Sequence, residues 1–201
     1  MNQICQSIII GSILGDATIY PCNQNNEAIL EYKYDNKSFS YLKWLHENLK
    51  TLGLGKIKPH KGFHQHRFRT FPNRELGELR NTFYPEGKKV VPENINKLLI
   101  HPISLAVWYM DDGCLDFRAK DHSNATLATF SFSKKECQLL SETLRTNFNL
   151  LLGVHKNCMR GKPYYRLYVS SRSMNRFISL IQPFILPCFS YKLPKFHQQS
   201  R

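Results

Sequence analysis

Apolar and polar positions follow one order in each half of the chain. In the first half, a continuous apolar run at 8–17 precedes two segments of alternating apolar and polar residues, around 18–20 and 30–34. A continuous run of this kind predicts a buried helix, and strict alternation predicts a strand with one covered face. Apolar residues at helical spacing over 38–52, stopped by Gly53, predict a surface helix.

The second half repeats this order after a second apolar run at 105–113. The acid that ends this run follows the acid that ends the first run by 96 residues, the difference between positions 112 and 16. Ser38 and Ser133 stand at similar places as candidate helix caps. The other expected elements are strands near 56–59 and 65–71 and a helix over 75–83, then strands near 114–118 and 125–132, a helix over 134–148, strands near 154–158 and 164–170, and a helix over 174–186.

The repeated order predicts an α+β fold built from two similar halves. We expect an N-terminal half at 1–84, a linker at 85–100 that is rich in charge and in helix-breaking residues, and a C-terminal half at 101–201. A chain of 201 residues can bury a hydrophobic core large enough to fold without covalent crosslinks.

Each apolar run ends in a carboxylate, at Asp16 and at Asp112. The C-terminal end of a helix already carries partial negative charge, so an acid there does not stabilise the helix. For either run alone, a buried helix followed by an Asp in a turn explains the pattern. Both runs together favour two acids brought close to hold a divalent cation, because two nearby carboxylates would otherwise repel.

Small residues predict how the two helices meet. Gly11 and Gly15 lie on one helical face, which allows another helix to approach closely. We expect that partner to be the second run, with Ala106 and Val107 facing the glycines. Parallel packing would then place the two acids at the same end. Asp111 has a glycine at the matching position of the first run, and we interpret it as a solvated or helix-end residue.

Composition favours a polyanionic partner. The formal net charge is +13, from 28 Lys and Arg against 15 Asp and Glu. Nucleic acid is the leading candidate, with a basic surface that only aids solubility as the alternative. An anionic membrane surface fits less well, because the charges are spread along the chain. No apolar stretch approaches the roughly 20 residues of a membrane span, and the N-terminus resembles neither a signal nor a transit peptide.

Cysteines and histidines give no metal motif. The six cysteines have no zinc-module spacing, and we expect reduced, mostly buried thiols. A cluster of His60, His64 and His66 straddles an expected hairpin, which makes DNA contact a better expectation than an imidazole metal site.

With these features in hand, the two apolar runs resemble the paired motifs of the single-chain LAGLIDADG homing endonucleases. The runs at 10–17 and 105–113 carry the resemblance, together with 88–92 before the second motif and 186–194 near the end. The resemblance implies a pseudo-twofold αββαββα architecture, with the motif helices at its centre and two antiparallel sheets forming a DNA-binding saddle. It also implies a monomer with an internal pseudo-dimer.

The same resemblance implies the site residues. The last acid of each motif, Asp16 and Asp112, would bind Mg²⁺, for which Mn²⁺ is the expected substitute. A lysine from each half, Lys89 and Lys192, would lie near the cleavage site. These lysines could stabilise charge in the transition state or polarise the attacking water, or they could contact phosphate without a catalytic role. Val107 and Trp108 are larger than close helix packing favours, which leaves the crossing of the helices open.

Recognition should fall to the strands, where basic and aromatic residues alternate with apolar ones. A two-stranded ribbon fits the major groove of DNA. For any single residue, phosphate contact is a safer expectation than base contact. The candidate DNA contacts are Lys33, Lys56, Lys58, Lys61, Arg67, Arg69, Arg118, Lys120, Lys156, Arg160, Lys162 and Arg166.

The sequence thus predicts a Mg²⁺-dependent, site-specific endonuclease that makes double-strand breaks at a long asymmetric DNA site and promotes intron mobility. The alternatives are an RNA maturase that binds its host intron and a DNA-binding protein without catalysis. We expect no membrane partner. We expect an organelle location, mitochondrion or chloroplast, with the bacterial cytoplasm as the other possibility.

Overall fold

Two four-stranded antiparallel sheets and the helices around them make up the protein. The computed structural model describes residues 1–22, 25–118, 122–159 and 161–194, with the backbone alone at 117–118, 122–123, 159 and 162. The strand order is β1-β2-β4-β3 in the first sheet and β5-β6-β8-β7 in the second. The two halves therefore share one topology, which confirms the predicted α+β fold and its duplication.

The first half contains three α-helices and four strands among the described residues. Two short 3-10 turns, Asn36–Ser38 and Lys50–Leu52, flank the helix α2. The elements are α1 (Gln3–Leu14), β1 (Thr18–Pro21), β2 (Ala28–Asp35), α2 (Phe39–Leu49), β3 (Lys58–His60), β4 (Gln65–Arg69) and α3 (Arg74–Phe83).

The second half repeats these elements after a short helix that the sequence did not predict, α4 (Ile95–Leu98), which lies within the expected linker. After the last of the repeated elements come two 3-10 segments, η3 (Gln182–Phe184) and η4 (Pro187–Lys192), near the end of the described residues. The other elements are α5 (Pro102–Asp112), β5 (Gly113–Arg118), β6 (His122–Ala128), α6 (Lys134–Phe148), β7 (Leu152–Met159), β8 (Lys162–Val169) and α7 (Ser171–Ile181).

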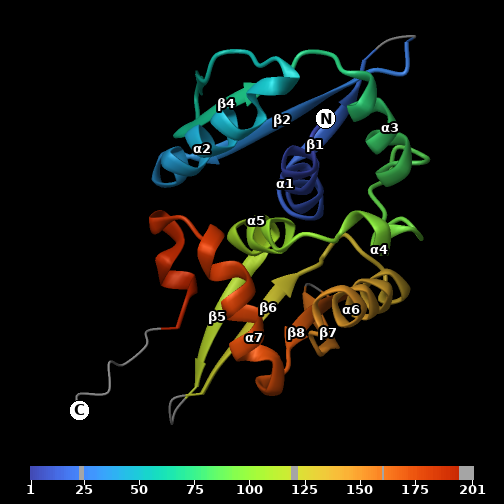
Figure 1. Ribbon diagram of the computed structural model, residues 1–201, viewed down its shortest axis with the longest axis vertical. Helices are drawn as coiled ribbons and strands as arrows, with labels where there is room; N and C mark the ends of the chain where they lie inside the picture. Colours follow the sequence, from blue (N-terminus) through green and yellow to red (C-terminus); the bar gives the residue numbers. More distant parts are fainter. Residues whose placement is uncertain (23–24, 119–121, 160, 195–201) are drawn as a thin grey trace.

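The helices α1 and α5 lie side by side at the centre, between the two sheets (Figure 1). Most of α1 and the span from Ile103 to Met110 of α5 are buried, and Trp108 is completely enclosed. Helices α2 and α3 contact the first sheet, and α6 and α7 contact the second. Within the described residues, no helix is long and apolar enough to cross a membrane.

Helix caps differ between the halves. Ser133 caps α6 through a capping box, since its side chain accepts the Glu136 N–H and the Glu136 carboxylate accepts the Ser133 N–H. Ser38 makes no such bond, so its predicted role is wrong. Asp35 accepts the Ser38 N–H instead and caps the 3-10 turn before α2.

The cysteines are free thiols, as expected, but most of them are not buried. Cys5 and Cys137 are buried, two others are half-buried, and Cys114 and Cys158 are exposed. Both exposed residues lie on strands of the second sheet, where alternate side chains point away from the core.

Candidate functional site

The central helices pack in parallel, with their C-terminal ends together. A Cβ on Gly11 would stand 2.3 Å from the carbonyl oxygen of Ser104, and one on Gly15 would stand 2.5 Å from the carboxylate of Asp111. Residue numbers therefore rise in the same direction along both helices, which means that the helices are parallel. The predicted contact of the glycine face with Val107 is confirmed, since the Cβ on Gly11 would stand 2.9 Å from that side chain. Ser104 and Asp111 complete the facing stripe.

This packing brings Asp16 and Asp112 into electrostatic range of each other. Loss of hydration raises the pKa of Asp112 to about 7, and the charge of Asp16 contributes to this shift. The pKa of Asp16 is also raised, first by loss of hydration, although Lys89 and Lys192 act against the shift. Both acids would gain from a nearby cation, because a positive charge stabilises their ionised forms.

Lys89 lies against the end of the first central helix. Its Nζ donates a hydrogen bond of 2.8 Å to the carbonyl oxygen of Gly15, the residue that ends α1. Loss of hydration lowers its pKa, and the charges of Asp112 and Asp16 oppose this shift. The lysine therefore neutralises a helix end as well as facing both acids.

Lys192 holds the matching position at the end of α5. Its Nζ donates to the carbonyl oxygens of Met110 at 2.6 Å and of Tyr109 at 3.2 Å. The Tyr109 hydroxyl donates in return to the Lys192 carbonyl oxygen at 2.9 Å. Lys192 is buried, and burial lowers its pKa, opposed most by the charge of Asp111. Both predicted lysines thus stand at the helix ends, in hydrogen bonds that the sequence did not predict.

Asp111 is a helix-end residue of α5, which is one of the two expected alternatives, and it is not solvated as the other alternative expected. Its carboxylate accepts a hydrogen bond of 2.8 Å from the Tyr34 hydroxyl and one of 3.3 Å from the backbone N–H of Asp16. Loss of hydration raises its pKa well above the usual value, and the charge of Asp16 adds to this. The reason is the glycine at position 15, which leaves room for an acid on the opposite helix. Asp111 therefore links the two halves and fixes the backbone of Asp16.

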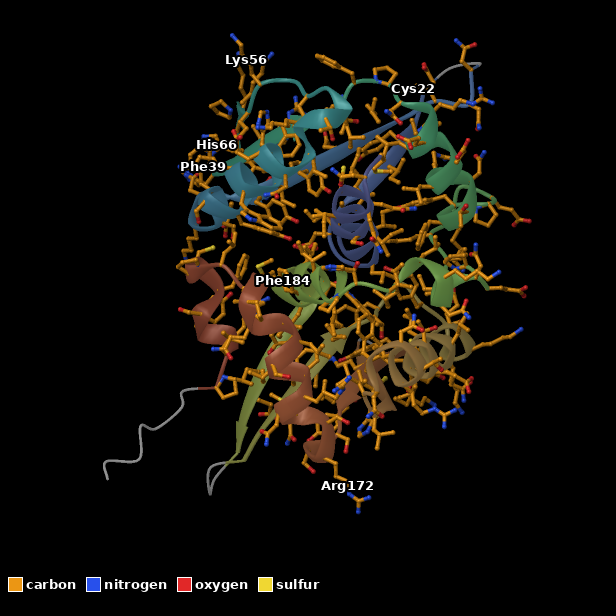
Figure 2. All side chains as sticks on the ribbon, in the orientation of Figure 1. Cys22, Phe39, Lys56, His66, Arg172 and Phe184 are labelled. Carbon is orange, nitrogen blue, oxygen red and sulfur yellow. The ribbon has the colours of Figure 1, made fainter. Side chains whose placement is uncertain are left out.

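The first sheet carries basic side chains on the face opposite its buried residues. Lys33 on β2 pairs with Arg67 on β4, which pairs in turn with Lys58 on β3. These three residues form a row across the sheet. A shallow hollow of about 210 Å³ is lined there by Lys56, Lys58, Arg67 and Arg69, together with Gly55 and Phe68. Figure 2 shows Lys56 extending outward from this half. Lys61 is exposed in the turn between β3 and β4.

The second sheet has a matching hollow of about 290 Å³ on its own open face. Arg166 lies in it, with its guanidinium over the rings of Phe130 and Tyr164, at 5.4 and 5.5 Å. The other residues that line it are Asp116, Thr126, His155, Asn157 and Tyr168.

For four of the predicted DNA contacts in the second half the side chain is not described, and a fifth does not lie on the open face of the sheet. Lys120 and Arg160 lie outside the described residues, and for Arg118 and Lys162 only the backbone is described. Lys156 pairs with Tyr165, so alternation directs it to the face opposite the hollow, away from its neighbour His155.

The histidine cluster contacts other protein groups. The Nδ1 of His66 is hydrogen-bonded to the Asn36 side chain at 3.0 Å, and its ring packs on Phe39 (Figure 2). His60 packs on Phe63 with ring centroids 4.7 Å apart. In the described part of the chain, no group of three or more His, Cys, Asp or Glu side chains could hold a metal ion.

The paired acids nevertheless fit a magnesium ion that is completed by its substrate. Mg²⁺ keeps several waters and is commonly bound by one or two carboxylates plus phosphate oxygens rather than by a full protein cage. Asp16 and Asp112 are hard oxygen donors at one end of parallel helices, and both have raised pKa values without a cation. Their chemistry fits the group, with the remaining ligands left to water and phosphate.

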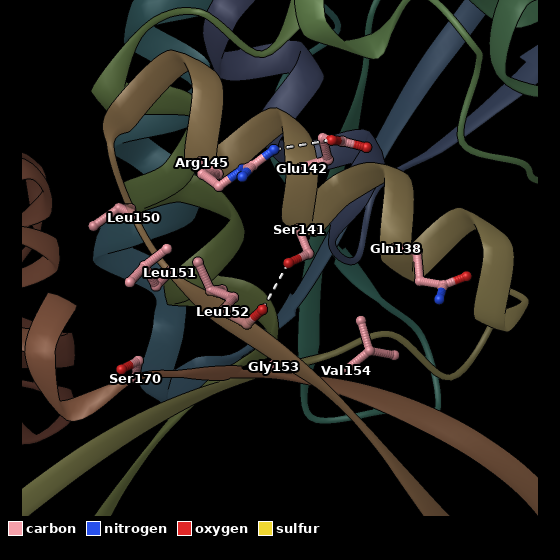
Figure 3. Close-up of a pocket in the computed structure, with 10 residues that line it drawn as sticks. All are labelled: Gln138, Ser141, Glu142, Arg145, Leu150, Leu151, Leu152, Gly153, Val154 and Ser170. Atoms are coloured by element: carbon pink, nitrogen blue, oxygen red, sulfur yellow. Dashed lines mark hydrogen bonds and ion pairs between the residues drawn. The ribbon is translucent and has the colours of Figure 1, made fainter.

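A third hollow, of about 370 Å³, lies between α6 and β7 and is separate from these features (Figure 3). Ser141 donates across it to the Leu152 carbonyl oxygen at 2.6 Å. Its charged residues, Glu142 and Arg145, form an ion pair with each other at 3.1 Å. The acids and lysines of the helix ends do not line it.

Sequence reasoning missed three residues of the site. For Asp111 the available signal was the glycine at the matching position of the first run, because a small residue on one helix leaves room for a larger side chain on the other. Tyr34 is found only through its hydrogen bond to Asp111. The third is Glu31, whose carboxylate contacts Lys33, Arg67 and Arg69 on the open face of the first sheet. Its signal was alternation, since it stands two residues from Lys33 on the same strand and must share its face.

Comparisons with known proteins identify the family to which the chain is similar. A family model described as the LAGLIDADG DNA endonuclease family matches residues 6–177. The chain is 28% identical to a cytochrome b mRNA maturase bI2 of Debaryomyces hansenii, covering 92% of this chain and 72% of the relative. It is also 28% identical to a probable intron-encoded endonuclease 1 of Wickerhamomyces canadensis, covering 96% of this chain and 85% of the relative.

Solved structures show the same fold. The homing endonuclease I-WcaI bound to its DNA recognition sequence matches with a TM-score of 0.82 and 26% identity, over 96% of this chain and 86% of that one. I-DmoI in complex with DNA and Mn matches with a TM-score of 0.59 and 17% identity, over 92% of this chain and 99% of that one. The duplicated topology, the paired central helices and a family match over most of the chain lead to one conclusion: this protein belongs to the LAGLIDADG DNA endonuclease family.

Proposed function

We propose that this protein is a site-specific DNA endonuclease that makes double-strand breaks in the presence of a divalent cation, with Mg²⁺ as the physiological ion and Mn²⁺ as a substitute. The observation that carries the proposal is the pair Asp16 and Asp112, at the same end of two parallel helices between two open strand faces. Relatives that are named intron-encoded endonucleases or were solved with DNA and Mn support it.

In this mechanism Asp16 and Asp112 would hold the divalent cation at the paired helix ends, where the scissile phosphates would bind. A bound divalent cation lowers the pKa of water and neutralises charge on the leaving oxygen. Lys89 and Lys192 stand beside the acids with their amino groups fixed on helix-end carbonyls. From there they would place positive charge near the reacting phosphate. Two quasi-equivalent sites at the paired helix ends would cut one strand each, so one copy of the chain suffices.

The strand faces read the DNA. The row of Lys33, Arg67 and Lys58 in the first half and Arg166 in the second half would contact bases and phosphates in the major groove. These contacts differ between the halves, which supports a long asymmetric target site.

A cleavage selection tests the proposal. A library of randomised duplexes is incubated with the protein in Mg²⁺, in Mn²⁺ and in EDTA, and molecules with double-strand breaks are sequenced. We expect breaks at one enriched sequence with either metal and none in EDTA. If DNA is bound but no member is cut in either metal, the protein is a DNA-binding protein without catalysis.

The second candidate function is that of an RNA maturase, favoured by the 28% identity with the bI2 maturase of Debaryomyces hansenii. A splicing assay of the intron that encodes the chain, with and without the protein, separates the two activities. Faster splicing with intact DNA cleavage would mean that both activities reside in one chain.

The intron-encoded relatives also support our proposal of an organelle location.

A further inference from the structure

A buried acid lies under the basic side chains of the first sheet. Glu31 alternates with the buried Leu30 on β2, so it points to the same open face as Lys33. Its side chain is only 3% exposed because cations surround it. Arg69 donates through Nε to its carboxylate, and the charged groups of Lys33 and Arg67 lie 3.4 and 3.8 Å from it.

This acid is charged, and its charge opposes DNA binding. Loss of hydration acts to raise the pKa of Glu31, but the hydrogen bond and charge of Arg69, helped by Lys33, outweigh it and hold the pKa below its usual value. A carboxylate on a surface that receives a polyanion weakens the non-specific attraction. Affinity for phosphate therefore gives no reason for an acid here.

Base recognition does give a reason. An arginine that reads guanine must present its flat guanidinium group in one orientation to make two hydrogen bonds. Arg69 is held through Nε by Glu31, and its guanidinium lies 5.9 Å from the ring centre of Tyr20. Its side chain is still 51% exposed, which leaves the terminal amino groups within reach of DNA.

The second sheet has no acid at the matching position. There Thr126 pairs with Cys114, on the strand that follows the second central helix. Glu31 pairs in the same way with Thr18 on the strand that follows the first. On its other side Thr126 pairs with Tyr168, whereas Glu31 pairs there with Arg69. An effect of Glu31 on recognition should therefore be confined to one half of the target.

We propose that Glu31 is a positioning residue for base recognition, which fixes Arg69, Arg67 and Lys33 on the open face of the first sheet. It lowers affinity for arbitrary DNA and raises discrimination in the half-site that the first sheet contacts. This inference rests on the proposed function, because it assumes that the protein recognises a DNA sequence.

The test compares Glu31→Gln with Glu47→Gln, which makes the same charge change at an exposed position of α2. Wild type and both variants bind a randomised duplex library in EDTA, and bound molecules are sequenced. We expect Glu31→Gln to lose about tenfold in base preference at the positions that Arg69 reads, within the range that one bidentate arginine contact supplies. The other half-site should keep its preferences, and binding to unrelated duplex should rise. Glu47→Gln should keep the wild-type profile.

A second variant separates position from charge. Glu31→Asp keeps the charge but shortens the side chain, so we expect the same loss of preference with no rise in binding to unrelated duplex. Far-UV circular dichroism and thermal unfolding establish that each variant is folded. If Glu31→Gln fails to fold, Glu31→Asp alone decides.

Three outcomes with the variants would overturn the inference. The half-site preferences could survive in the folded variant, both half-sites could lose preference equally, or binding to all DNA could fall together, as expected for a purely structural residue. A wild-type protein that selects no sequence but cuts DNA would also overturn it. If the wild type neither selects nor cuts DNA, the proposed function fails as well.

Discussion

The two lysines of the site explain how acids can stand at helix ends, where charge disfavours them. Lys89 and Lys192 donate hydrogen bonds to the last carbonyls of α1 and α5 and bring positive charge to both ends. The resemblance of the sequence to a known family predicted these residues near the acids. It could not predict the carbonyl contacts, because these depend on where two distant segments return to the centre.

We expect Lys192→Met to lower the free energy of unfolding by about 1–3 kcal/mol, because the buried carbonyl oxygens of Tyr109 and Met110 would lose the Lys192 amino group as a donor. Methionine keeps most of the apolar stem and removes the amino group. Urea unfolding measures the change, with the exposed Lys156→Met as control, expected within about 0.5 kcal/mol of wild type. If Lys192→Met is as stable as wild type, the amino group does not stabilise the helix end.

Glu136 predicts a dependence of stability on acid pH. Loss of hydration opposes its ionisation, but hydrogen bonds from Ser133 and from the Val91 N–H outweigh it and lower the pKa. A lowered folded-state pKa stabilises the fold above the unfolded-state pKa, and this contribution is lost as pH falls through the folded-state value.

The Glu136→Ala variant should therefore be less stable than wild type near neutral pH, and the gap should shrink as pH falls below about 4.5. Urea unfolding over a pH series measures it, with Glu142→Ala on the same helix as control. A gap that stays constant down to low pH would contradict the role of the ionised carboxylate.

At the scale of elements, the hydrophobic pattern predicted most of the helices and strands but was less informative about where each of them ends. The strands and helices on either side of the core follow from alternation and helical spacing. The helix expected over 38–52 instead has a 3-10 turn at each end, and at the first of these turns Asp35 takes the cap that Ser38 was expected to make. Both residues are good caps, and only the backbone geometry decides between them.

Gly11→Ala tests the contact between the central helices. The new Cβ would stand 2.3 Å from a main-chain oxygen of α5, so the helices must move apart, at a cost of about 1–3 kcal/mol or more. Thermal or urea unfolding measures it. Gly55→Ala is the control, because its Cβ meets its nearest atom at 3.4 Å. Equal stabilities for the two variants would contradict the close packing of α1 on α5.

At the scale of the whole molecule, the duplication was visible in the sequence, but the difference between its halves was not. Both halves have the same strand order. Their open faces differ: Arg67 lies near Glu31 in one half, and the guanidinium of Arg166 lies over a pair of aromatic rings in the other. Such differences arise from side chains that meet across strands, and a repeat in hydrophobic pattern contains no information about them.

The net charge of +13 predicts steep salt dependence of DNA binding. If about 6–10 phosphates are contacted, affinity should fall by roughly 10³-fold or more between about 50 and 200 mM salt. Fluorescence anisotropy with a labelled duplex measures the slope. A nearly flat dependence would mean that the basic strand faces do not contact the phosphate backbone.

The central claim is that Asp16 and Asp112 are both needed to hold the divalent cation on which double-strand cleavage depends. Its most direct test is cleavage of the selected duplex in Mg²⁺ by Asp16→Asn and by Asp112→Asn, with binding measured in parallel. We predict that each variant binds the duplex about as well as wild type and makes no double-strand breaks. Full double-strand cleavage by both variants would contradict the claim.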